Sequence, residues 1–147
     1  MAIINNNVKP LKSDRDKNVF IGIDLPFRKS ENQGNGYFES TESTFEAVSN
    51  NIKSLLLTQK GERIMQPSLG LNLKKYLFEQ INSDTMILIE NDIYDAIKFW
   101  LPFVEISDIV VNVGDDSDIG RNSILIDVKF SINRSNNYFD TVSVTIT

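Results

Sequence analysis

The chain has 147 residues, of which 41% are hydrophobic and 24% charged, and this composition predicts a globular protein. It contains neither cysteine nor histidine, which excludes disulfides, thiolate metal sites and any catalytic triad built on an imidazole. A formal net charge of −5 argues against nucleic acid as the main partner, and no apolar run is long enough to predict a membrane span.

The N-terminal part combines an irregular arm with the start of a folded domain. Residues 1–39 are predicted to form an arm with one short extended segment, and residues 40–147 a single domain. A helix is predicted over residues 44–58, because Ser43 and Glu46 have the capping-box spacing and apolar residues follow at helical intervals.

A turn-rich connector runs from Gly61 to Gly70. Gly61 is expected to end the first helix, because glycine adopts the left-handed C-terminal conformation at the lowest cost. A short helix should follow, carrying Leu71, Leu73, Leu77 and Phe78, and Phe78 is expected to be a core residue. The second long helix is expected to have Ser83 as its N-cap and to stop at Pro102, with an apolar stripe along one face.

From Val104 onward the hydrophobic pattern alternates, which predicts β-strands. Three strands are expected over residues 104–113, 123–132 and 138–147, with an irregularity near Asp108 that indicates a bulge. The predicted fold class is therefore α+β with two layers: an antiparallel C-terminal β-meander packed against two long helices and a short one.

The last strand has the features of an exposed sheet edge. It has no proline, and no charged residue follows Asp140. At an edge, its unpaired amides and carbonyls would be a template for the strand of another chain. The alternative is that it lies inside the sheet or beneath the N-terminal arm. The residues expected to form the edge are Tyr138, Phe139, Val142, Val144 and Ile146.

Catalytic and metal-binding motifs are weak. The acidic loop from Asp115 to Gly120 has calcium-loop composition, but Ile119 stands where an EF-hand needs an oxygen ligand, so a solvated hairpin connection is the preferred interpretation. Glu62 and Glu79 are a conceivable carboxylate pair for a glycosidase, although the sequence does not make them face each other. No catalytic residue, cofactor or metal is predicted, and a carbohydrate- or metal-binding module at residues 114–122 is a further alternative.

One stretch of the chain resembles a known family. After the first helix come Leu-Leu-x-Thr, Gly-Glu-Arg, a proline and a glycine, and then Leu-x-x-x-Leu-Phe from Leu73 to Phe78. This order resembles the small baseplate wedge subunit of contractile phage tails, a family that includes a type VI secretion baseplate component and was historically labelled lysozyme-like. The family often carries a Glu-Pro-Arg triplet after the second long helix, whereas this chain has Leu101, Pro102 and Phe103 there.

The resemblance implies a structural, non-enzymatic subunit of the tail baseplate, assembled in the bacterial cytoplasm. It would dock on the other wedge proteins and offer its sheet edge to the tail sheath protein to initiate sheath polymerisation; the tail tube is a further candidate partner. The motif residues are equally well explained by partner contact and by support of the fold: Gly61, Glu62, Arg63, Pro67 and Gly70. The alternative function is a lysozyme-like hydrolase of the tail that degrades peptidoglycan.

Overall fold

The computed structural model describes residues 21–24, 27, 29, 38–41, 43–79, 82–113, 123–132 and 139–147. The chain divides into two compact units, Met1–Asn51 and Ile52–Thr147. The acidic loop at residues 114–122, the turn expected at 133–137 and Tyr138 lie outside the described residues.

The first unit contains a small two-stranded sheet that the sequence did not reveal. Strand β1 (Gly22–Ile23) pairs antiparallel with β2 (Ser40–Thr41). Asn50 Nδ2 donates to Asp24 Oδ1 over 3.2 Å, a bond that joins helix α1 (Thr44–Leu57) to the end of β1.

Helix α1 begins as the sequence predicts. Ser43 Oγ accepts the backbone N–H of Phe45 over 3.2 Å, one residue earlier than the capping box requires. Four buried side chains recur at helical spacing: Val48, Ile52, Leu55 and Leu56. The helix ends at Leu57, so the prediction that Gly61 terminates it is wrong; Gly61 belongs to the turn that follows.

Two further helices follow in the second unit, the 3₁₀ helix η2 (Leu73–Phe78) and the helix α2 (Ser83–Trp100). The N-cap of α2 is Asn82 and not the predicted Ser83, because Asn82 Oδ1 accepts the backbone N–H of Thr85 over 2.9 Å. Asparagine and serine are both good N-caps, so composition alone could not separate these neighbours.

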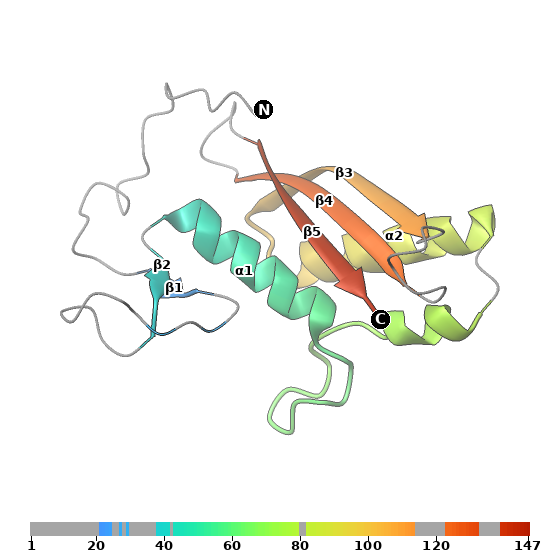
Figure 1. The fold of residues 1–147 in the computed structure, drawn as a ribbon, viewed down its shortest axis with the longest axis horizontal. Helices are drawn as coiled ribbons and strands as arrows, with labels where there is room; N and C mark the ends of the chain where they lie inside the picture. The colour runs from blue at the N-terminus through green and yellow to red at the C-terminus, as the bar shows by residue number, and fades with distance from the viewer. Residues whose placement is uncertain are drawn as a thin grey trace. The chain divides into compact units, whose positions relative to one another are not determined.

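A three-stranded antiparallel sheet completes the second unit. Strands β3 (Val104–Val113), β4 (Ile124–Ile132) and β5 (Phe139–Ile146) lie in the order β3-β4-β5. The register shifts between Ile106 and Asp108, which confirms the predicted bulge. The chain therefore has the predicted α+β fold, and Figure 1 shows α2 running behind the strands.

The core of the second unit lies between this sheet and the helices. Ile89, Ile93 and Ile97 of α2 are fully buried, as is Phe130 of β4. The expectation that Phe78 is a core residue is wrong, because its side chain is 86% exposed at the end of η2. Its neighbour Tyr76 is buried instead; a 3₁₀ helix has three residues per turn, and this changes which side chains face inward.

Candidate functional site

Strand β5 is an edge of the three-stranded sheet within the described part of the chain, because only β4 is its neighbour. Val142, Val144 and Ile146 are buried in the core, whereas the residues between them are exposed. The buried residues fix the register of the strand, since a shift by one residue would turn every apolar side chain to the solvent.

The outward-facing amides of β5 can be assigned from one hydrogen bond. The backbone N–H of Thr141 donates to Asp140 Oδ1 over 2.9 Å, and this bond is exposed. An amide directed into the sheet would be occupied by β4, so this bond places the backbone groups of Thr141 on the open side. Because alternate residues of a strand share an orientation, Ser143 and Thr145 direct their N–H and C=O groups the same way.

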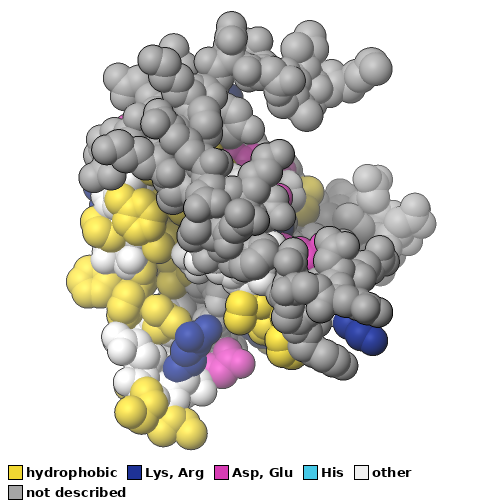
Figure 2. Space-filling view, turned by 90° about the vertical axis from the view of Figure 1, so that its left-hand side faces the viewer, with side chains coloured by type: hydrophobic (Ala, Val, Ile, Leu, Met, Phe, Trp, Pro, Cys, Tyr) yellow, Lys and Arg dark blue, Asp and Glu magenta, His cyan; other side chains and the backbone are white. Residues whose placement is uncertain are grey.

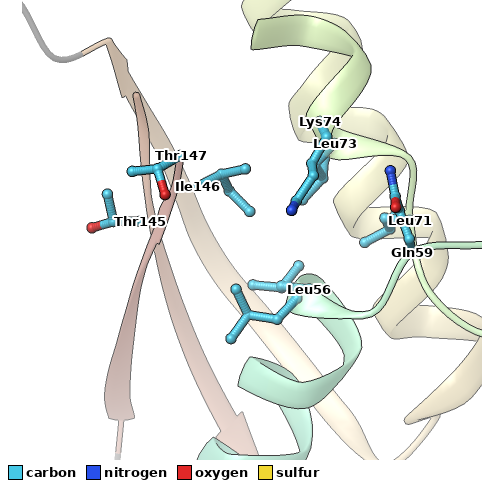
Figure 3. Close-up of a pocket in the computed structure, with 9 residues that line it drawn as sticks. Leu56, Gln59, Leu71, Leu73, Lys74, Thr145, Ile146 and Thr147 are labelled. Carbon is cyan, nitrogen blue, oxygen red and sulfur yellow. The ribbon is translucent and has the colours of Figure 1, made fainter. Parts of the chain in front are cut away.

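A cavity lies at the C-terminal end of the same strand (Figure 3). It has a volume of about 150 Å³. Five of the nine lining residues are aliphatic and four are polar, and Lys74 directs its amino group into the cavity (Figure 3). The lining residues are Leu56, Leu57, Gln59, Leu71, Leu73, Lys74, Thr145, Ile146 and Thr147.

The Gly-Glu-Arg motif builds a closed loop after α1. Gly61 has φ +89° at the third position of a turn, where the N–H of Glu62 donates to the carbonyl oxygen of Gln59 over 3.1 Å. Glu62 Oε2 accepts the N–H of Gln59 over 3.0 Å, which holds the same turn from the side chain. The N–H of Gly61 donates to the Pro67 carbonyl oxygen over 2.8 Å and closes the loop.

The end of the loop is equally constrained. Gly70 has φ +99°, and a Cβ atom there would lie 2.8 Å from the carbonyl carbon of Thr58 and closer still to its oxygen. The neighbouring N–H of Leu71 donates to that same oxygen over 2.9 Å. Glycine therefore meets two requirements at this position: the backbone is left-handed, and it lies close to the backbone of Thr58.

The polar motif residues bond within the chain, and two apolar residues between them face outward. Arg63 donates to Ser54 Oγ over 3.4 Å at the surface. Ile64 and Met65 are 95% and 94% exposed at the tip of the loop. Hydrophobic side chains form the lower end of the surface in Figure 2, where Figure 1 places this loop. The motif thus supports a rigid loop that presents an apolar tip.

Comparison with known proteins identifies the family. Residues 42–137 match the family described as Baseplate wedge protein gp25. The chain belongs to the baseplate wedge protein gp25 family. No curated protein sequence matches it significantly.

Solved structures similar to this chain include chains of two baseplates. A protein of Geobacter sulfurreducens described as a candidate tail lysozyme is 26% identical and has a TM-score of 0.61, with 71% of this chain and 90% of that chain covered. A chain of the anti-feeding prophage baseplate is 23% identical and has a TM-score of 0.61, with 78% of this chain and 86% of that chain covered. A chain of the type VI secretion baseplate complex is 14% identical and has a TM-score of 0.52, with 68% of this chain and 89% of that chain covered. The last two likenesses establish the fold.

The segment that follows α2 has Leu101, Pro102 and Phe103 where the family often carries a Glu-Pro-Arg triplet. Leu101 caps the helix, because its N–H donates to the carbonyl oxygen of Ile97 over 2.8 Å. Pro102 and Phe103 are exposed, and the ring of Phe99 lies 5.1 Å from that of Trp100 in an edge-on arrangement. Apolar and aromatic side chains therefore occupy the segment at which the family often carries a Glu-Pro-Arg triplet.

A second hollow, of about 590 Å³, lies between the connector and α2. Beside it, the hydroxyl of Tyr76 donates to Asp92 Oδ2 over 2.8 Å, and Lys75 Nζ lies 3.8 Å from the same oxygen. Burial, followed by the bond to Asp92, raises the pKa of Tyr76 above 10.0, and contact with Tyr76 is the first cause of the raised pKa of Lys75. Sequence reasoning missed this cluster, because Tyr76 lies outside the helical apolar pattern.

The two carboxylates considered for hydrolysis lie at the surface of the protein. Glu62 and Glu79 are both exposed, and Glu62 is engaged in the turn at Gln59. Within the described ranges, no three acidic side chains gather in a way that could hold a metal ion. None of the helices described combines the length and apolar character that crossing a bilayer requires.

Proposed function

We propose that this chain is a structural, non-enzymatic subunit of the baseplate of a contractile tail or a related injection device. It docks on neighbouring wedge proteins and offers the open edge of β5 to a strand of the tail sheath protein. Membership of the gp25 family supports the baseplate role, and the similar chains from the anti-feeding prophage and type VI baseplates have the same fold.

The observation that supports the sheath-initiating role is the position of β5 at the edge of the three-stranded sheet, where the described residues provide no neighbour other than β4. The outward N–H and C=O groups of Ser143 and Thr145 can form hydrogen bonds with a partner strand. Proteins normally block such edges with charge, proline or a covering segment. Only Asp140, at the start of the strand, carries charge. Main-chain hydrogen bonds to this edge would set the position of the first sheath subunit.

Docking on the wedge proteins uses two apolar surfaces. The first is the loop tip formed by Ile64 and Met65, and the second is the segment from Phe99 to Phe103. Exposed apolar side chains on rigid elements bind through burial, at about 25 cal/mol per Å² of apolar area removed from water. The motif residues Gly61, Glu62, Pro67 and Gly70 act indirectly, by holding the loop.

The substitution Ser143→Pro tests the sheath-initiating role. Proline removes the outward N–H of an edge strand and leaves the bonds to β4, and such positions tolerate it. We expect tails that carry this variant to show baseplates or bare tubes without sheath in electron micrographs. Ser143→Ala, which removes only the hydroxyl, should give normal sheaths. Normal sheaths on Ser143→Pro tails with a folded subunit would contradict the role of the edge.

A peptidoglycan hydrolase is the competing function, because the 26% identical Geobacter protein is described as a candidate tail lysozyme. It predicts that the purified protein clears cell-wall substrate between pH 4 and 8, and that Glu62→Gln abolishes the clearing. We expect no clearing by either protein, since the Glu62 carboxylate serves a turn. Clearing that is lost in the variant would overturn the structural role.

A further inference from the structure

We propose that the cavity at the end of β5 is the anchor site of the incoming sheath strand. It would receive one aliphatic side chain of that strand, next to an acidic residue that pairs with Lys74. This inference rests on the proposed function and adds to it the sequence character of the partner segment.

The position of the cavity follows from the strand edge. Residues opposite each other in paired strands project their side chains to the same face. Ile146 is buried on the helix side of the sheet and is itself part of the cavity wall. A partner residue placed opposite Ile146 would therefore direct its side chain into the cavity, toward Leu56 (Figure 3), and Leu57 lines the same cavity.

The outward amides that can bind a partner strand lie in the same C-terminal part of β5 as the cavity. The N–H of Thr141 is already occupied by Asp140, so the available groups begin at Ser143 and continue to Thr145. Thr145 also lines the cavity. A strand that pairs with these residues thus reaches the cavity without any further turn of its backbone.

The size and charge of the cavity define what fits. A volume of about 150 Å³ has room for one aliphatic side chain such as leucine or isoleucine. Among the described residues that line the cavity, Lys74 alone has a charged side chain. An acidic group on the partner would complement this ammonium, and a basic one would be repelled.

Two pairs of variants test the anchor site. Leu57 is 57% exposed, and Leu57→Trp should fill the cavity from its outer wall; Leu88, also 57% exposed, supplies the control Leu88→Trp on α2. Lys74→Glu reverses the charge at the cavity, and Lys98→Glu makes the same change at an exposed site on α2. All four side chains are exposed, so the variants should fold.

The measurement is binding of the full chain to the tail sheath protein of the same tail, combined with hydrogen exchange at Ser143 and Thr145. We expect the wild type to protect these amides on binding, and Leu57→Trp and Lys74→Glu each to weaken binding by about tenfold or more. The two control variants should bind as the wild type does.

The outcomes separate the inference from the function on which it rests. Protection of the two amides with equal binding by all four variants would leave the edge role standing and overturn the anchor site. Absence of protection in the wild type would overturn both. Weakening by the controls as strongly as by the cavity variants would also overturn the anchor site, because the effect would then not depend on position.

Discussion

The two glycines with positive φ make opposite demands on a side chain, and a pair of alanine variants separates them. Gly61 has φ +89°, and apart from its chain neighbours no described residue has an atom within 4 Å of its Cβ position. Gly70 has φ +99° and faces the backbone of Thr58. Gly61→Ala should therefore cost only the left-handed backbone, about 1–2 kcal/mol. Gly70→Ala adds an overlap with immobile backbone and disturbs the bond from Leu71 to Thr58, which raises the loss to about 3–6 kcal/mol.

Thermal and urea unfolding followed by circular dichroism measure the difference. For a chain of this length, each kcal/mol shifts the melting temperature by about 2–4 °C. We expect Gly61→Ala to melt about 2–8 °C below the wild type and Gly70→Ala at least about 6 °C below it. Equal losses in the two variants would refute the assignment of a steric role to Gly70, and a neutral Gly70→Ala would refute the geometry of the loop.

Three further outcomes follow from single contacts. Tyr76→Phe should lose about 1 kcal/mol at neutral pH; because the folded-state pKa of Tyr76 is raised above 10.0, wild-type stability should also fall as pH rises beyond about 10, and urea unfolding across pH 8–11.5 should show a flatter profile for the variant. Asn82→Ala should lose about 1 kcal/mol and Ser83→Ala nearly nothing, and the reverse order in the same urea assay would return the cap to Ser83. Replacing Ile64 and Met65 by serine should leave the melting temperature unchanged while removing wedge proteins from tail pull-downs; retention of those proteins would exclude the loop tip as a docking surface.

The elements that the sequence predicted are those whose signals are local and periodic. The helix beginning at Thr44, the alternation of the three strands and the bulge near Asp108 depend on near neighbours in the chain, and all are confirmed. The errors occur where neighbours compete: Asn82 and Ser83 are both good caps. Tyr76 is buried and Phe78 is exposed, because the short helix has the 3₁₀ and not the α period.

The candidate site was predictable only in part, because edges and cavities depend on long-range pairing. The absence of charge after Asp140 indicated an edge strand, and among the described strands β5 stands at one end of the order β3-β4-β5. The hydrogen bond at Thr141 shows which amides face outward, and no sequence pattern reveals that bond. The cavity is formed by α1, the connector, η2 and β5, elements separated by up to about three fifths of the chain, so no local motif could indicate it. The boundary of the N-terminal arm at residue 39 stays a prediction.

The residues that identify the family and the residues available to partners are different sets. Gly61, Glu62, Pro67 and Gly70 carry the sequence resemblance, and every one of them is engaged in the turn, closure or close approach that shapes the connector. Backbone geometry of this kind admits few substitutes, whereas an exposed tip must match only its partner. Partner specificity should therefore reside in side chains that the motif does not include, at the loop tip, after α2 and at the end of β5. Transferring such side chains between two members of the family should then transfer the choice of partner, and transferring the motif should not.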